Sequence, residues 1–200
     1  MSIRHVIAIA LGLAMGSAHA ADITASRQTA ASAKARAGEP EFRALYKELV
    51  EINTTLSVGS CTAAANAMKA RLSAAGFSDE QLHLVVPPDR PNDGNLVAWL
   101  PGSDAKLKPL LLLAHIDVVE ANRADWERDP FKLVEENGYF YARGASDDKS
   151  MAAAFVANMI RMKRDGFVPN RDIILALTAD EEIIPSQFSG VEYLLKTTAI

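Results

Sequence analysis

The side chains best suited to chemistry fall in three short polar clusters, each at the end of an apolar segment or in a loop beside one. The first cluster is His115-Ile116-Asp117, which directly follows the apolar run Leu110 to Ala114. Alternate residues of an extended chain point the same way, so His115 can bind a metal while Asp117 orients its ring. Taken alone, a His-x-Asp pattern is more typical of a hydrogen-bonded structural histidine, so the other clusters decide its meaning.

The second cluster is the run Arg143-Gly144-Ala145-Ser146-Asp147-Asp148-Lys149. A carboxylate in such a loop can bridge two cations, because each of its oxygens can direct a lone pair toward a different metal. The competing interpretation is an aspartate that caps the start of the following helix. For Asp148 we favour that capping role or a surface role, whereas the role of Asp147 depends on the wider context.

The third cluster, Asp180-Glu181-Glu182, follows an apolar segment at 173–177. Adjacent carboxylates repel each other, and a bound metal relieves that repulsion. One glutamate can then bind the metal while its neighbour carries a proton to and from an attacking water. An isolated acidic pair is more typical of a solvated charge run, but its position at the end of a strand favours a site.

The elements that must position these clusters are predicted from the spacing of apolar residues. Helices are expected over 42–52, 62–75, 150–163 and 190–196, and strands over 81–86, 95–100, 110–114 and 173–177. A hairpin is expected around Asn137-Gly138, which is a strong turn signal between the segments 131–134 and 139–142. Strands that alternate with helices favour an α/β layered sheet with helices on both faces.

Three smaller features predict how these elements pack. Four consecutive leucines at 110–113 suit a strand that is covered on both faces. Met151, Phe155, Met159 and Met162 follow one side of the helix expected at 150–163, which we interpret as ordinary core packing. The single cysteine, Cys61, has no candidate catalytic partners nearby and is interpreted as a buried structural thiol.

Together the clusters carry a family resemblance. The segments LLLLAHIDVV, DWERDPF, NGYFYARGASDDKS and LALTADEE resemble the M20 family of zinc metallopeptidases and deacylases, and the similarity covers roughly residues 40–200. The resemblance implies a zinc-exopeptidase-like catalytic domain that cleaves amide bonds in peptides or N-acyl amino acids. An alternative interpretation is a non-catalytic binding module on a truncated hydrolase fold, and a third is a hydrolase with one metal or another metal.

The resemblance also implies a role for each residue of the clusters. His115 would bind one zinc ion, Asp147 would bridge two, and Glu182 would bind the other. Asp117 would orient His115, and Glu181 would be the general acid and base. The peptide bond after Asp147 is expected to be cis, and Trp126, Asp129-Pro130-Phe131 and Arg143-Gly144 are expected to shape the loops around the site.

By the same resemblance, a complete site needs a further carboxylate, a late histidine and an inserted lid domain. None of these is recognisable in the 200 residues, where His83 is interpreted as structural. We therefore expect residues 41–200 to form the N-terminal half of a discontinuous catalytic domain. That half alone should bind zinc poorly and be inactive, because each metal would lack protein ligands.

The beginning of the chain has the features of a secretory signal peptide. Arg4 precedes an apolar run from Val6 to Met15, and Ala18-His19-Ala20 offers a cleavage site. We expect cleavage after Ala20, a flexible leader over 21–40, and a periplasmic or secreted protein. The apolar run is too short for a stable membrane anchor.

Composition limits the partners of the protein. The chain has 21 Lys and Arg residues against 25 Asp and Glu residues, a formal net charge of −4, and no basic block. This balance argues against nucleic acid or an anionic membrane surface as a partner. The expected partner is a small peptide or N-acyl amino acid; its identity and the oligomeric state stay open.

Overall fold

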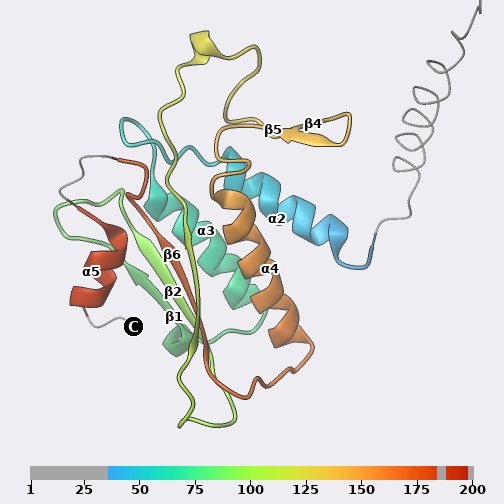
Figure 1. Cartoon of the computed structure of the whole chain (residues 1–200), viewed down its shortest axis with the longest axis vertical. Helices are drawn as coiled ribbons and strands as arrows, with labels where there is room; N and C mark the ends of the chain where they lie inside the picture. Colours follow the sequence, from blue (N-terminus) through green and yellow to red (C-terminus); the bar gives the residue numbers. More distant parts are fainter. Residues whose placement is uncertain (1–35, 184–187, 198–200) are drawn as a thin grey trace, which may run out of the picture. The chain divides into compact units, whose positions relative to one another are not determined.

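A mixed four-stranded sheet lies at the centre of the computed structural model, which describes residues 36–183 and 188–197 (Figure 1). Its strand order is β1-β2-β6-β3, with β1 at Leu82–Val85, β2 at Asn95–Leu100, β6 at Ile173–Thr178 and β3 at Leu110–His115. Strand β6 is antiparallel to β2 and parallel to β3. The carboxyl ends of β3 and β6 therefore meet the beginning of β2 at one edge of the sheet.

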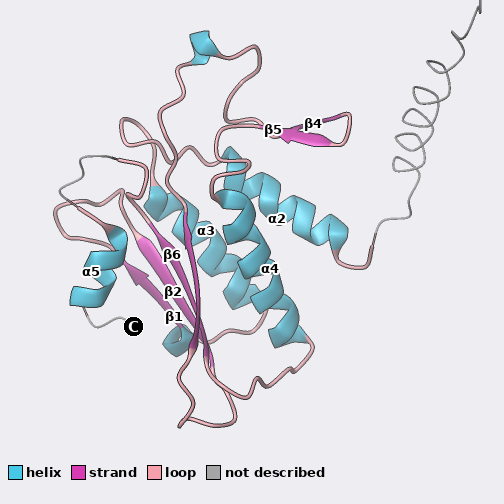
Figure 2. Cartoon of the chain, viewed as in Figure 1, coloured by secondary structure: helices cyan, strands magenta, loops and turns pink. Residues whose placement is uncertain are grey.

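Helices pack against both faces of this sheet, which confirms the predicted α/β class (Figure 2). One face carries α2 (Glu39–Glu51), α3 (Cys61–Ala74) and α4 (Lys149–Arg164). The other face carries the short helix α5 (Gly190–Lys196). Because helices cover both faces of the sheet in this three-layer packing, polar residues are expected at the ends of its strands.

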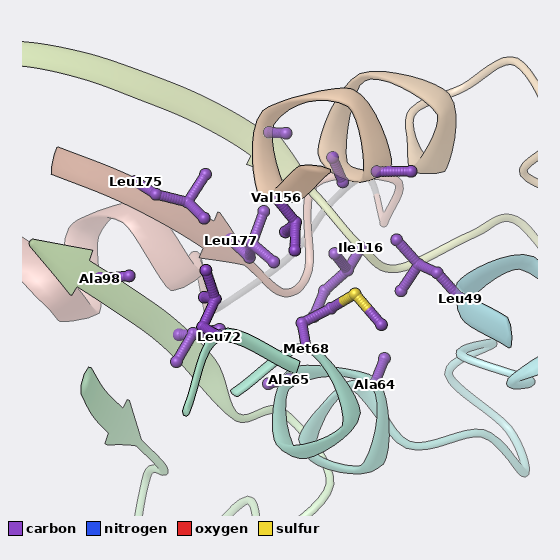
Figure 3. Packing of buried hydrophobic residues seen from close by; sticks show 14 of the residues in the cluster. Leu49, Ala64, Ala65, Met68, Leu72, Ala98, Ile116, Val156, Leu175 and Leu177 are labelled. Atoms are coloured by element: carbon purple, nitrogen blue, oxygen red, sulfur yellow. The ribbon is translucent and has the colours of Figure 1, made fainter. Parts of the chain in front are cut away.

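The core lies between the sheet and helices α2, α3 and α4, and Figure 3 shows its centre. Alternate residues of β2 and β6 face these helices, because successive side chains of a strand point to opposite sides. Met68 from α3, Val156 from α4 and Leu177 from β6 are all fully buried there. Ile116, directly between His115 and Asp117, is also fully buried, so the core anchors the first polar cluster.

Local signals account for most element boundaries. The Ser60 side chain accepts a hydrogen bond from the Ala63 amide at the start of α3, as expected for an N-cap. The predicted hairpin is present as β4 (Val134–Glu136) and β5 (Tyr139–Tyr141). The turn between them has positive φ at Asn137 and Gly138, as its two residues allow.

Two short 3₁₀ helices, Asp79–Gln81 and Arg123–Asp125, complete the elements of the described residues. One predicted boundary, the end of the leader at residue 40, needs correction. Pro40, predicted to close the leader, lies in the first turn of α2, where its missing amide hydrogen costs nothing. The predicted signal peptide at 1–20 lies outside the described residues, as does the predicted leader up to residue 35. Within the described ranges, no helix has the length and apolar character needed to span a membrane.

The predicted packing of β3 is wrong for one of its faces. Leu112 and Ala114 contribute to the core beside α4, but Leu111 and Leu113 are 47% and 46% exposed. Helix α5 covers the other strands on that face through Leu194, which packs with Val97 and Ala176. With only seven residues, α5 leaves the leucines of the edge strand uncovered within the described part of the chain.

The predicted methionine stripe of α4 is only partly a core stripe. Met159 is fully buried, but Met151 is 48% exposed. The buried side of the helix instead runs through Ala152, Ala153 and Val156. Small alanines at these positions allow α4 to lie close to its neighbours, so the helix turns Met151 toward solvent.

Candidate metal centre

The three polar clusters meet at the edge of the sheet where β3 and β6 end. His115 is the last residue of β3 and is paired in register with Thr178, the last residue of β6. The loop after β6 carries Glu181 and Glu182, and the loop before α4 carries Asp147. Residues far apart in the sequence thus come together because parallel strands end at the same side of a sheet.

His115, Asp147 and Glu182 form a group with the geometry of a metal site. One ligand atom from each residue lies within 4.8 Å of the other two. The closest pair is His115 Nε2 and Asp147 Oδ1, at 3.0 Å. Imidazole and carboxylate groups at this separation can bind one ion together or hold two ions bridged by the carboxylate of Asp147.

The electrostatics of the group favour a cation. Burial by itself lowers the pKa of His115, but the carboxylates of Asp117, Asp147 and Glu181 outweigh it and raise that pKa to about 9. Burial, reinforced by the charges of Asp147 and Glu181, raises the pKa of Glu182. Neighbouring negative charges thus contribute to both shifts, and a bound divalent cation would neutralise them.

Asp117 holds the first and third clusters together. Its Oδ2 accepts hydrogen bonds from the backbone amides of Glu181 and Glu182, both at 2.9 Å, and its Oδ1 lies 3.5 Å from His115 Nδ1. Burial raises the pKa of Asp117, but His115 and the two amides outweigh it, so the net direction is down. The buried, ionised carboxylate therefore holds the acidic loop, while His115 Nδ1 faces both this carboxylate and the Asp117 backbone oxygen, which lies 3.3 Å away.

Asp147 and Asp148 take different positions at the start of α4. The peptide bond between them is cis, as expected from the family resemblance. The exposed carboxylate of Asp147 faces His115, whereas Asp148 occupies the N-cap position. The side chain of Asp148 makes no capping hydrogen bond, so the predicted capping interaction is absent although the position is correct.

Glu181 stands beside the group rather than within it. Its side chain is 64% exposed, and its Oε2 lies 3.8 Å from His115 Nε2. Its backbone is held by Asp117, so the carboxylate projects from a fixed point toward the solvent side of the group. A proton-transfer group needs this combination of a fixed backbone and access to a water molecule.

Lys149 closes the second cluster and supports the site, although no role was predicted for it from the sequence. Its side chain is fully buried, and Nζ donates a hydrogen bond of 2.7 Å to the backbone oxygen of Ile52. Burial lowers the pKa of Lys149 to about 8, although the negative groups around it oppose that change. A lysine in the first turn of a helix usually lies in solvent, so sequence alone carried no signal of this burial.

Gly144 shows why the loop before α4 requires its particular sequence. It has a φ of +76°, and an added Cβ would lie 2.6 Å from Val118 Cγ1. The neighbouring Ala145 oxygen accepts a hydrogen bond of 2.5 Å from the Tyr46 hydroxyl. The loop that carries Asp147 is therefore fixed between α2 and the segment that follows β3.

Other residues singled out in the sequence lie around the centre. The Arg143 guanidinium lies 5.3 Å from the centroid of the Trp126 ring, and its amide donates to the Pro130 oxygen at 2.7 Å. Cys61 is buried, as predicted, and burial raises the pKa of its thiol. His83 is exposed on β1, outside the group.

A histidine and carboxylates gathered at the carboxyl edge of an α/β sheet are typical of the class of hydrolases that use a bound metal ion. Within that class, residues 111–199 match the sequence model of peptidase family M20/M25/M40. Residues 111–199 therefore belong to the M20 family, which confirms the resemblance found in the sequence.

Two relatives illustrate the similarity. The chain is 42% identical over 82 residues to N-fatty-acyl-amino acid synthase/hydrolase PM20D1 of Mus musculus, which covers 41% of the chain and 16% of the relative. It is 30% identical over 168 residues to aminoacylase-1 of Sus scrofa, covering 82% of the chain and 39% of the relative. The chain thus spans well under half the length of these relatives.

The fold is shared with solved structures. A metallo-carboxypeptidase of the M20 family from Sulfolobus solfataricus superposes with a TM-score of 0.64 at 23% sequence identity. The match covers 80% of this chain and 35% of that protein. The described residues therefore share part of the fold of that structure.

Proposed function

We propose that the protein is a zinc-dependent hydrolase that cleaves amide bonds in peptides or N-acyl amino acids. The observation that carries this proposal is the group of His115, Asp147 and Glu182, with the exposed carboxylate of Glu181 beside it. Nitrogen and oxygen donors of this kind suit zinc. The electrostatics support it further, because the cluster has more negative charge than its own residues neutralise.

Each residue contributes a separate function to the proposed reaction. His115 would hold one zinc ion, Glu182 would hold a second, and Asp147 would contribute to both. Zinc, when bound, supplies a Lewis acid that acidifies water and stabilises developing negative charge on the amide oxygen. Glu181 takes the proton of the attacking water and later donates it to the leaving amine. Asp117 keeps His115 in the tautomer that leaves Nε2 available.

The names of the relatives support the substrate class. PM20D1 is named for fatty-acyl amino acids, and the other similar proteins include an aminoacylase and carboxypeptidase S. All three names point to a bond between an acyl or peptidyl group and an amino acid. We propose the same bond for this protein. We further propose that residues 1–20 direct its export.

Glu181→Gln tests the proposed catalytic group. In the whole protein, we expect zinc content within about twofold of wild type and a loss of hydrolysis of about 10²–10⁴-fold, as for removal of a general base. The assay measures amine release from dipeptides and N-acyl amino acids, and elemental analysis gives the number of zinc ions. Glu192→Gln, an exposed glutamate on α5, is the matched control.

The outcomes of this test separate the candidate functions. Normal turnover in Glu181→Gln would refute the assignment of the proton-transfer group. In the whole protein, zinc binding without hydrolysis of any amide substrate would favour the non-catalytic binding module. His115→Ala is expected to lower the zinc content, and unchanged zinc in that variant would refute a ligand role for His115.

A further inference from the structure

The loop Ala179–Glu182, which follows β6, is held by side chains from distant parts of the chain. The Ala179 amide donates to Asn95 Oδ1 at 3.0 Å, and the Glu181 and Glu182 amides donate to Asp117 Oδ2. Asp180 lies between these two anchors with a φ of +66° and a buried side chain. The positions of Glu182, the proposed ligand, and Glu181, the proposed proton carrier, therefore depend on the contacts that hold Asp180.

Arg90, in the loop between β1 and β2, contacts the Asp180 side chain. Its Nη2 lies 3.4 Å from Asp180 Oδ2, and its Nε donates to Asp93 Oδ2 at 2.5 Å. The planar guanidinium also lies 4.7 Å from the centroid of the Phe188 ring. Arg90 thus links the turn before β2 to two residues that follow β6, namely Asp180 and Phe188.

The positive charge of Arg90 can compensate the buried negative charge of Asp180. Asp180 is only 2% exposed at its side chain and precedes two further carboxylates. A buried carboxylate next to other acids is destabilising unless a cation compensates it. Arginine suits this task better than lysine, because its fixed fork can bond two carboxylates while one face stacks on an aromatic ring.

We propose that Arg90 is a positioning residue for Glu181 and Glu182 and acts on them through Asp180. This inference rests on the proposed function, since it assigns Arg90 to the same site. Within the described residues, the guanidinium of Arg90 contacts Asp93, Asp180 and the Phe188 ring rather than the proposed metal ligands. Its effect on the site comes from fixing the backbone conformation at Asp180, which aims the next two amides at Asp117.

Hydrogen exchange in the metal-free protein tests the positioning directly. Arg90→Met should speed exchange of the Glu181 and Glu182 amides by about tenfold, because the loop opens more often. Arg71→Met is the matched control, since Arg71 is 34% exposed, close to the 30% of Arg90, and pairs with Glu48 between α2 and α3. The control should leave both amides unchanged. Equal exchange in the two variants would overturn the proposal.

A mutant cycle shows whether Arg90 acts through Asp180. Asparagine tolerates positive φ, so Asp180→Asn removes the charge without straining the backbone. The proposal expects Arg90→Met to weaken zinc binding about tenfold, and Arg90→Met with Asp180→Asn to bind no more weakly than Asp180→Asn alone. Arg90→Lys, which keeps the charge, should restore part of the affinity. Additive losses would refute the route through Asp180.

These two measurements separate the inference from the proposed function. If the whole protein binds no zinc, the proposed function fails, and amide exchange alone decides the role of Arg90. If the whole protein binds zinc and hydrolyses amides but exchange at Glu181 and Glu182 is unaffected by Arg90→Met, the role of Arg90 is refuted and the proposed function stands.

Discussion

Replacement of Asp117 by asparagine is the sharpest test of how the site is built. The carboxylate accepts two amide hydrogen bonds at 2.9 Å through Oδ2, and its Oδ1 faces His115 Nδ1 at 3.5 Å. Asparagine has one oxygen and one NH₂ group, so it cannot satisfy both sides. If its NH₂ group faces the amides of Glu181 and Glu182, donors meet donors and both hydrogen bonds are lost.

The opposite orientation of asparagine is also unfavourable for metal binding. Its NH₂ group would then donate to His115 Nδ1, which places the ring proton on Nε2. Nε2 is the nitrogen that faces Asp147, at 3.0 Å from Oδ1. Because zinc binds a deprotonated nitrogen, this tautomer opposes the metal. Both orientations of the substituted side chain therefore weaken the site, one through the acidic loop and one through the histidine.

We expect Asp117→Asn to weaken zinc binding by about 10–100-fold, the range for residues that orient metal ligands, or roughly 1.4–2.7 kcal/mol. Competition with a chromophoric chelator at fixed pH measures the affinity. Asp172→Asn is the control, since its Oδ1 accepts one amide hydrogen bond of 2.7 Å from Gly102 near the other end of β6. A zinc affinity of Asp117→Asn within about twofold of the control would refute the reasoning.

Two further predictions concern the pH dependence of zinc binding and the loop before α4. Because the pKa of His115 is raised to about 9 without metal, zinc must displace a proton below that pH. Zinc affinity should therefore rise about tenfold per pH unit from 7 to 8, whereas a pH-independent affinity would contradict it. Gly144→Ala should destabilise the protein by about 2–3 kcal/mol, because its Cβ would clash with Val118 at positive φ. Gly138 also has positive φ, but an added Cβ there would meet no atom within 4 Å, so Gly138→Ala should lower the free energy of unfolding in urea by only about 1 kcal/mol. Equal losses in the two variants would refute the clash at Gly144.

Local patterns predicted the elements of this protein well. Helix α5 begins at Gly190, where the sequence predicted the start of a helix, and the hairpin turns at Asn137-Gly138. These features depend on residues a few positions apart, so short-range physics is sufficient to predict them. The predicted position of Asp148 at the helix start was correct for the same reason, although its side chain makes no cap.

Patterns that depend on the neighbours of an element were less informative. The leucines of β3 predicted burial on both faces, but only the tertiary arrangement shows that α5 leaves Leu111 and Leu113 exposed. The exposure of Met151 likewise depends on how closely α4 packs through its alanines. Burial is a property of the assembled layers, and a strand or helix alone cannot specify it.

The sequence by itself determined the three polar clusters, their order and their position at strand ends, because period-two spacing and strand termination are local properties. The family resemblance that these clusters carry then predicted His115, Asp117, Asp147, Glu181 and Glu182 as one candidate site. Only the tertiary structure decided what supports them. Arg90 and Lys149 come from a loop and a helix start that have no pattern of their own, and they reach the site through long-range packing. Charged residues have many possible partners in a sequence, and the fold selects among them by bringing a few within hydrogen-bonding distance.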